Sequence, residues 1–437
     1  MSFRCLILTG DYSGDHHAAG VVDAITHQLP DAQFAGVGGP NLARTGATII
    51  HDQANMGKLG LSSLLSIPQH WQLGRKVLTF SKEWQPDVVL LIDYGMFNLH
   101  MAKQFKTSRQ LKKTPTVLYF IPPQVWVSRR HRLKTIRAFV DHVFCIFPFE
   151  KPLYAAENIP VTYVGHPLVR QLPPPVTKNT FCNRHNLNPN VPLLGVFPGS
   201  RRSEIAMLLT PMIGCLKQIR QNQPNVEIVL AQAESIPDVL MNQALEKAYA
   251  THKTSERELK LQIIQSENHA LLSASTAALL ASGTVTLEAA LYKTPMVIAY
   301  RLQPWVYAIA MQMVYLKRAG LPNILTDIDN PPIPEVLQDD LTPANLFAAL
   351  SPLLDEMGAE DHALKKPTSN ETLKPANASV EKVDHQTGTN KFRQRQLDAF
   401  DTIAAELHCE TSAAVYVANE IIQLLQIKKK EKCFEKI

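Results

Sequence analysis

The stretch Gly195-Val196-Phe197-Pro198-Gly199-Ser200-Arg201-Arg202-Ser203-Glu204-Ile205 decides the fold of this chain. It joins an apolar strand, Leu193–Phe197, to a Pro-Gly-Ser-Arg turn, and a helix is expected to begin just past that turn. Backbone N–H groups, the Ser200 hydroxyl and the Arg201 guanidinium then converge on the N-terminus of the helix, where anions are favoured. The stretch therefore predicts an α/β unit with a site for an anion such as a diphosphate.

A second segment repeats this arrangement. Ala278–Glu288 contains a strand, the small-residue turn Ser282-Gly283-Thr284 and the start of a helix, with the carboxylate of Glu288 one helical turn further on. A single Gly-rich turn is weak evidence for nucleotide binding. Two such turns in one α/β half favour a nucleotide site.

The composition describes a globular protein of more than one domain. The chain has 437 residues, 45% of them hydrophobic, and a formal net charge of +5. This length favours two or three domains. No apolar run reaches the roughly 18 residues of a membrane-spanning helix. The first residues lead directly into a strand, Phe3 to Leu8, and not into a signal peptide, so a cytoplasmic location is expected.

The chain carries no recognisable metal-binding pattern. Its six cysteines are scattered, without a C-x-x-C pair or a His cluster at ligand spacing, which predicts reduced thiols and no zinc site. His16 and His17 are adjacent and would point apart on a helix. Asp327-Ile328-Asp329 resembles a metal-binding D-x-D motif, but it lies in a Pro-rich loop and is interpreted as a surface turn. Neither a metal nor a cofactor is expected.

Apolar strands alternate with helices through both halves of the chain, which is typical of βαβ units. The first half has candidate strands at Arg4–Leu8, Gln33–Val37, Val88–Ile92, Thr116–Phe120, His142–Ile146 and Val161–Val164, and the second at Leu193–Phe197, Glu227–Ala231, Leu261–Ile264, Ala277–Leu280 and Met296–Tyr300. The prolines of Leu172-Pro173-Pro174-Pro175 form a stiff linker between them. The predicted fold is α/β, with two Rossmann-like doubly wound domains whose sheet edges face a cleft.

These patterns set the expected domain boundaries. Residues 1–172 form the first domain, 173–192 a linker and 193–355 the second domain. Residues 356–396 are polar and are interpreted as a disordered insertion. Helical periodicity returns over 397–427 and predicts terminal helices, and 428–437 is a basic tail, usually a solvated feature.

Several separated motifs occur together in one order. They are Gly10-Asp11-Tyr12-Ser13-Gly14-Asp15, Gly38-Gly39-Pro40, Phe149-Glu150, Gly165-His166-Pro167-Leu168, Pro198-Gly199-Ser200-Arg201, Ala281-Ser282-Gly283-Thr284 with Glu288, Pro295-Met296-Val297 with Tyr300-Arg301, and Leu321-Pro322-Asn323-Ile324-Leu325. From about Cys5 to Gln338 the chain thus resembles lipid-A-disaccharide synthases. The resemblance implies a GT-B fold and an inverting transfer from UDP-2,3-diacylglucosamine to the 6-hydroxyl of 2,3-diacylglucosamine 1-phosphate.

Asp93 is the candidate general base for such a transfer. It closes the strand Val88–Ile92, and an apolar approach to that sheet edge would raise its pKa toward useful basicity. The first Asp of the family's Asp-x-Pro-Asp-Phe-Asn motif falls on Asp93, although Met96 stands in place of the second Asp. The alternative is that Asp93 only caps the following turn.

The first loop departs from the family pattern as well. Asp11 stands where the resemblance expects Glu, with Tyr12 beside it. Asp11 keeps the charge and shortens the reach by one methylene, a change to which a near-attack geometry is sensitive. Ser13, a candidate contact for the UDP-sugar, belongs with Gly14 and Asp15 to a turn and N-cap that are expected to precede a helix over Ala18–Leu29.

The UDP-sugar donor is expected to bind at the two phosphate-type turns. Arg201 can neutralise the charge of the departing diphosphate without a metal; the alternative is a surface ion pair with Glu204. Glu288 resembles the carboxylate that accepts from ribose hydroxyls in GT-B enzymes. The full set of candidate UDP-sugar contacts is Ser13, Gly199, Ser200, Arg201, Ser282, Gly283, Thr284, Glu288, Asn323 and Gln338.

Two segments could serve the lipid side. Met56–Leu78 is either an apolar, membrane-facing cover or a helix packed on its own domain, and the basic residues of Val127–Arg137 suit an anionic leaflet or the acceptor phosphate. With 7% aromatic residues, no nucleic acid partner is expected. We expect peripheral association with the inner face of the cytoplasmic membrane, and the terminal helices are compatible with a homodimer.

Two other functions stay open at this point. One is another GT-B UDP-sugar enzyme such as an epimerase, which has no need of acyl chains. The other is a relative that binds a UDP-sugar without turning it over, or that uses a different acceptor, which the departures at Asp11, Tyr12 and Met96 suggest.

Overall fold

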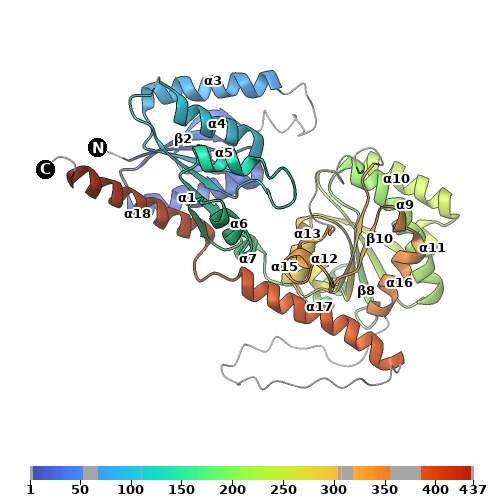
Figure 1. Ribbon diagram of the computed structural model, residues 1–437. Helices are drawn as coiled ribbons and strands as arrows, with labels where there is room; N and C mark the ends of the chain where they lie inside the picture. Colours follow the sequence, from blue (N-terminus) through green and yellow to red (C-terminus); the bar gives the residue numbers. More distant parts are fainter. Residues whose placement is uncertain are drawn as a thin grey trace, which may run out of the picture. The chain divides into compact units, whose positions relative to one another are not determined.

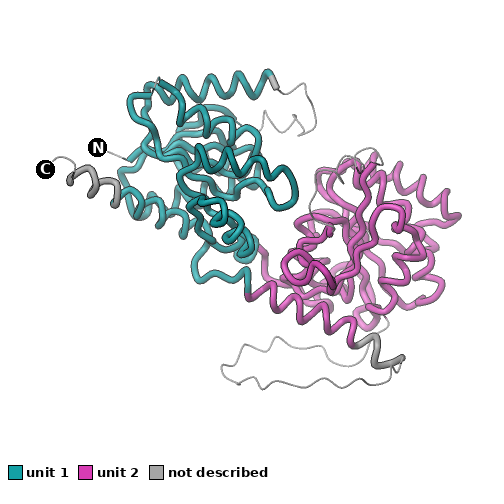
Figure 2. Tube along the Cα trace, in the orientation of Figure 1, with its two compact units in different colours: residues 1–171, 311–316, 406–437 teal, residues 172–310, 317–405 magenta. Residues whose placement is uncertain are grey.

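The computed structural model describes residues 3–52, 67–109, 111–303, 307, 318–354 and 385–434. These residues form two compact units (Figure 2). Within the described part of the chain, unit 1 contains the residues up to Gln171 and those from Glu406 onward, and unit 2 contains Leu172 to Ala405. The chain therefore leaves unit 1 after Gln171 and returns to it at Glu406.

Unit 1 is built on a seven-stranded sheet in the order β3-β2-β1-β4-β5-β6-β7, in which all neighbouring strands are parallel. The strands are β1 (Arg4–Leu8), β2 (Gln33–Gly38), β3 (Thr48–Asp52), β4 (Val88–Ile92), β5 (Thr116–Phe120), β6 (His142–Cys145) and β7 (Val161–Tyr163). Every residue of β4 and β5 is buried, because helices cover both faces of a parallel sheet.

The helices of unit 1 come from both ends of the chain (Figure 1). They are α1 (Tyr12–Gln28), α2 (Pro40–Arg44), α3 (Ile67–Trp84), α4 (Gly95–Thr107), α5 (Arg132–Phe139), α6 (Glu150–Ala156), α7 (Leu168–Gln171) and α18 (Ala413–Phe434). The last helix, α18, lies along α1 (Figure 1), and the Gln28 side chain donates to Asn419 at 2.7 Å. The C-terminal helix is thus an integral part of the first unit.

Unit 2 is built on six parallel strands in the order β10-β9-β8-β11-β12-β13. They are β8 (Leu193–Phe197), β9 (Glu227–Gln232), β10 (Leu261–Gln265), β11 (Ala277–Ala281), β12 (Met296–Tyr300) and β13 (Glu335–Leu337). The surrounding helices are α8 (Lys178–Arg184), α9 (Arg202–Asn222), α10 (Asp238–His252), α11 (Glu256–Leu259), α12 (Asn268–Ala274), α13 (Thr284–Leu291), α15 (Leu321–Leu325), the 3-10 turn η3 (Gln338–Asp340), α16 (Pro343–Leu354) and α17 (His385–Leu407).

The α/β class and both parallel sheets are confirmed, but several element boundaries differ from those expected. Helix α1 begins at Tyr12, not Ala18, because the Asp11 carboxylate caps it by accepting from Gly14 N at 2.7 Å. The short edge strands β3 and β13 are additional to the predicted ones.

The terminal helices also begin and end elsewhere than expected. Helix α17 begins at His385, inside the segment expected to be disordered, and Gln396 is buried on β12, where Met296 N donates to its side chain at 2.8 Å. Helix α18 continues to Phe434, into the expected basic tail. The predictions for residues 56–66 and 356–384 lie outside the described residues.

Candidate functional site

The loop after β4 is held in an uncommon backbone conformation. Asp93 and Tyr94 have φ values of +47° and +52°, in the left-handed region that non-glycine residues seldom adopt. The Tyr94 ring lies against Gly10, in the loop after β1, where an added Cβ would come within 2.2 Å of Tyr94 Cγ. Only glycine fits at this position, so the two loops pack directly on one another.

Two buried side chains hold the main chain of Asp93 in place. The carbonyl oxygen of Asp93 accepts hydrogen bonds from Asn98 Nδ2 at 2.8 Å and from the Tyr119 hydroxyl at 2.7 Å. Asp93 N donates to Phe120 O at 3.2 Å. Neither Asn98 nor Tyr119 was predicted to hold this loop, although Asn98 closes the motif that begins at Asp93.

The carboxyl group of Asp93 lies in an environment suited to a base. Burial, reinforced by the nearby negative charge of Asp11, raises the pKa of Asp93 to about 6. The N-cap of α4 is Tyr94, whose side chain makes no capping hydrogen bond. The two carboxylates that the sequence singled out in this half of the chain are thus close enough to interact.

The other residues of the first loop have different roles. Asp15 is fully buried, and its carboxylate accepts from Gly39 N, Asn41 N and Leu42 N at 2.6, 2.8 and 3.1 Å. It therefore caps α2 and not its own helix. Ser13, in the first turn of α1, is itself exposed, with its Oγ 3.3 Å from His17 Nε2.

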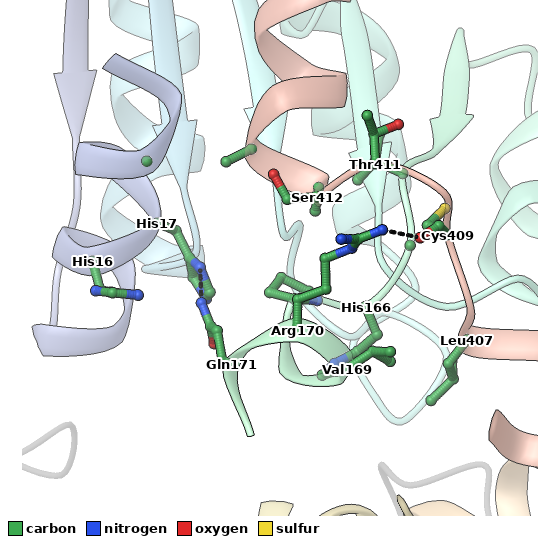
Figure 3. Close-up of a pocket in the computed structure, with 16 residues that line it drawn as sticks. His16, His17, His166, Val169, Arg170, Gln171, Leu407, Cys409, Thr411 and Ser412 are labelled. Carbon is green, nitrogen blue, oxygen red and sulfur yellow. Dashed lines mark hydrogen bonds between the residues drawn. The ribbon is translucent and has the colours of Figure 1, made fainter. Parts of the chain in front are cut away.

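A cavity of about 230 Å³ lies within unit 1, lined by α1, the segment 164–171 and the chain that returns from unit 2 (Figure 3). Burial lowers the pKa of both His17 and His166 to about 4, so both rings are neutral at pH 7. His17 Nδ1 lies 3.4 Å from Gln171 Nε2, and the Arg170 guanidinium donates to Cys409 O at 2.9 Å (Figure 3). The side chains around this cavity attach the returning chain to unit 1.

In unit 2, Arg201 lies at the N-terminus of α9 with its side chain 75% exposed. Its Nη1 donates to Glu204 Oε1 at 2.7 Å, which is the ion pair considered as the alternative. Glu204 Oε2 also accepts from Ser200 N at 2.9 Å and from Arg201 N at 3.1 Å. A carboxylate of the protein itself therefore occupies the donors at which an anion was expected.

Gly199 makes this turn possible. Its φ is +113°, and an added Cβ would lie 2.5 Å from Glu204 Oε2. A side chain at this position is excluded both by the backbone conformation and by the neighbouring carboxylate.

The second phosphate-type turn opens α13. Ser282 Oγ donates to Ala319 O at 2.6 Å, and Gly283 and Thr284 are exposed at the start of the helix. Further along α13, Glu288 Oε2 lies 3.5 Å from His269 Nε2, and burial raises the pKa of Glu288. The exposed turn and the carboxylate thus lie on one helix, as the sequence predicts.

Asn323 and Gln338 shape the loops after β12. Asn323 is fully buried; its Nδ2 donates to Ile333 O at 2.9 Å and to Glu335 Oε1 at 2.7 Å, and its Oδ1 accepts from Ile333 N at 3.1 Å. The Gln338 carboxamide faces the backbone of Leu302. These contacts give both residues a structural part in this region.

Trp126, the residue just before the basic segment Val127–Arg137, is hydrogen-bonded to the buried carboxyl group of Glu150. Trp126 Nε1 donates to Glu150 Oε1 at 3.0 Å, and Glu150 Oε2 accepts from Ile146 N and Phe147 N. Burial raises the pKa of Glu150 to about 7. On α3, Leu73 and Val77 are buried in the unit, whereas Trp71 is 59% exposed with the Arg75 guanidinium 4.8 Å from its ring centroid.

Neither a metal cluster nor a membrane span is found in the part of the chain that the structure describes. Within those residues, no group of three or more His, Cys, Asp or Glu side chains is arranged to hold a metal ion. Asp327 Oδ1 accepts from Asp329 N and Asn330 N, which makes this segment an exposed turn. None of the described helices has the length and apolar character needed to cross a bilayer.

The sequence is similar to one enzyme family over most of its length. The family model for lipid-A-disaccharide synthetase matches residues 5–387. The lipid-A-disaccharide synthase of Coxiella burnetii (strain Dugway 5J108-111) is 35% identical over 354 residues, which cover 80% of this chain and 88% of that protein. The enzyme of the same name from Trichlorobacter lovleyi is 34% identical over 355 residues, with 80% and 88% covered.

Solved structures share the fold at low sequence identity. A putative UDP-N-acetylglucosamine 2-epimerase from Listeria monocytogenes superposes with a TM-score of 0.57 at 13% identity, covering 99% of this chain and 98% of that one. Anabaena Alr3699/HepE in complex with UDP-glucose gives 0.53 at 12% identity, with 97% and 99% covered. These likenesses confirm the GT-B fold.

Proposed function

We propose that this chain, which belongs to the lipid-A-disaccharide synthase family, transfers 2,3-diacylglucosamine from its UDP derivative to the 6-hydroxyl of 2,3-diacylglucosamine 1-phosphate. The family is one of UDP-sugar-dependent glycosyltransferases. The observation that carries the reaction is the partly buried Asp93 carboxyl near the charge of Asp11, because its raised pKa of about 6 makes it both ionised and basic near neutral pH.

In the proposed step, the Asp93 carboxylate accepts the proton of the acceptor 6-hydroxyl. As it loses this proton, the 6-oxygen of the acceptor attacks the anomeric carbon of the donor sugar from the face opposite the diphosphate. The bond between that carbon and the diphosphate oxygen breaks, and its electron pair leaves with UDP, so the configuration inverts. Asn98 and Tyr119 hold the main chain of Asp93 during this step.

The donor nucleotide is assigned to the two turns of unit 2. The N–H groups of Ser200 and Arg201 and the Arg201 guanidinium already bind one anion, the carboxylate of Glu204. A phosphate oxygen that replaces this carboxylate gains the same charge-assisted donors, which stabilise the leaving group. Because Gly199 has no side chain, the space that the Glu204 carboxylate occupies beside these donors is not blocked.

The remaining donor contacts follow from the second turn and from α1. Gly283 and Thr284 supply donors at the start of α13, and Glu288 accepts from the ribose hydroxyls. Ser282 holds this turn, because its hydroxyl donates to Ala319 O and its N–H to Ala299 O. Ser13, exposed in the first turn of α1, contacts the donor sugar. Asn323 and Gln338 act through the loops that they hold, since their amide groups bond to the protein.

The acylated substrates place the enzyme at a membrane surface. Trp71 exposes an aromatic ring beside a guanidinium, a combination suited to the interface of a bilayer. Arg129, Arg130 and Lys134 are exposed near Trp126 and suit anionic lipid headgroups. We assign the protein to the inner face of the cytoplasmic membrane as a peripheral enzyme.

The test is UDP release from UDP-2,3-diacylglucosamine in detergent and EDTA, with and without the acceptor. Acceptor-dependent release that resists EDTA is expected. Conversion of the donor without acceptor would instead indicate an epimerase, and binding of the donor without turnover would indicate a non-catalytic or acceptor-switched relative.

A further inference from the structure

Two exposed apolar side chains lie beside the carboxylate pair of unit 1. Tyr12 is 71% exposed and Met96 is 68% exposed. Tyr12 is the first residue of α1, and Met96 is the second residue of α4. Single exposed hydrophobic residues are ordinary on protein surfaces, so it is the position of these two that matters.

The sheet brings their two helices to one edge. Strands β1 and β4 are parallel neighbours, with Leu8 opposite Leu91, so the loops that follow them emerge side by side. The contact of Gly10 with the Tyr94 ring joins these loops, and Asp11 raises the pKa of Asp93 across them. Tyr12 directly follows Asp11, and Met96 is on the first turn after Asp93.

The residues on either side of Met96 are held in place. The Tyr94 hydroxyl is hydrogen-bonded to His70 Nε2, and the Tyr94 and Phe97 rings pack with their centroids 5.1 Å apart. Phe97 is buried at 5% exposure, whereas Met96, its neighbour in sequence, projects into solvent. The flexible apolar side chain of Met96 is thus exposed close in sequence to the proposed base, between two residues, Tyr94 and Phe97, whose side chains are fixed by packing.

We propose that Tyr12 and Met96 are specificity-determining residues that contact the acyl chains of the acceptor next to its sugar ring. This assignment rests on the proposed function. In an acceptor whose 6-hydroxyl lies at Asp93, the acylated carbons 2 and 3 are on the opposite side of the same pyranose ring. Long side chains near the carboxylate, such as Tyr12 and Met96, can reach across one ring to the acyl chains. Covering Tyr12 and Met96 with acyl chain removes their exposed apolar surface from water, which favours binding of the acylated acceptor.

The test compares acceptors with and without acyl chains in the full-length protein. Met96→Gln is nearly isosteric and neutral, and Tyr12→Ser removes the ring without adding charge near Asp93. Val239→Gln is the matched control, because Val239 is also 68% exposed and is also the second residue of its helix, α10 in unit 2. All three positions are on the surface, so the variants are expected to fold.

For each variant, KM and kcat are measured with 2,3-diacylglucosamine 1-phosphate and with acyl-free glucosamine 1-phosphate, and equilibrium binding of both acceptors is measured in parallel. Met96→Gln and Tyr12→Ser should each raise KM for the acylated acceptor about fivefold to tenfold, with kcat, the KM for the donor and the acyl-free acceptor unchanged. Val239→Gln should match the wild type throughout.

The outcomes separate this assignment from the proposed function. Unchanged KM for the acylated acceptor, an equal change with both acceptors, or a change in the KM for the donor would overturn the assignment while transfer by the wild type stands. Absence of transfer by the wild type, seen before any variant is compared, would overturn the proposed function and the assignment with it.

Discussion

The side-chain amide of Asn98 donates a hydrogen bond to the main-chain carbonyl of Asp93 at 2.8 Å. Asn98 is fully buried on α4 and also donates to Ile92 O at 3.2 Å. One amide thus fixes both the end of β4 and the left-handed residue that follows it. The orientation of the proposed base is therefore set by a fully buried side chain.

Replacing Asn98 by Ala should lower kcat by about tenfold or more, because the main chain of Asp93 loses a hydrogen bond that positions the carboxylate. Stability should fall by about 1–3 kcal/mol, since carbonyl groups are left without their buried donor. Steady-state kinetics and urea unfolding measure both effects. Asn222→Ala removes an exposed amide whose Nδ2 bonds to Gln218 O at 2.8 Å and should change neither. A variant with the kcat of the wild type would show that Asn98 does not position the base.

The pH dependence of transfer should report the Asp93 carboxyl. The ionised form accepts the proton, so kcat/KM should fall as the pH drops through about 6. Asp11→Asn removes the neighbouring negative charge while retaining an N-cap, and should move this acid limb to lower pH. Asp23→Asn, at an exposed position further along α1, is the control and should leave the limb in place. An acid limb that stays fixed in Asp11→Asn would contradict the coupling of the two carboxylates.

Arg201→Ala should reduce kcat/KM for the UDP-sugar by roughly tenfold to a thousandfold, because a donor to the leaving diphosphate is lost. Its side chain is 75% exposed, so the melting temperature should hardly change. Arg202→Ala, the next residue on α9, serves as the matched control for charge. Equal kinetics of the two variants would remove Arg201 from the leaving-group site.

Glu150 should make stability depend on pH. Burial raises its pKa from 4.5 to about 7, so the stability that it contributes is fully present below pH 4.5 and is lost as the pH rises through 7. The free energy of unfolding of the wild type relative to Glu150→Gln should therefore decrease by about 3 kcal/mol over this range. Chemical unfolding at several pH values measures the difference. Parallel curves for the two proteins would contradict the raised pKa.

The central strands could be predicted from the sequence, and the edges could not. Val88–Ile92 and Leu193–Phe197 are continuous apolar runs bounded by turn residues, and β4 and β8 match them. Thr48–Asp52 and Glu335–Leu337 are short, partly polar edge strands, whose pairing depends on neighbours distant in sequence. Helix α17 begins early for a similar reason, since Gln396 finds its partner on β12.

The candidate site was predictable in its residue types more than in its geometry. Asp93 directly follows β4, and Arg201 lies in the turn between β8 and α9, and residues that follow the strands of a parallel sheet are at the edge where such sheets bind ligands. The positive φ of Asp93, the amide of Asn98 behind it and the occupation of the Ser200 turn by Glu204 depend on three-dimensional contacts that no local pattern specifies.

The most direct measurement compares the wild type with Asp93→Asn for formation of the disaccharide 1-phosphate, detected by mass spectrometry, alongside binding of UDP-2,3-diacylglucosamine. The wild type should form the product only with the acceptor present. Asp93→Asn should lose about a hundredfold or more of this rate while it binds the donor with unchanged affinity. A rate in Asp93→Asn equal to that of the wild type would contradict the assignment of Asp93 as the base.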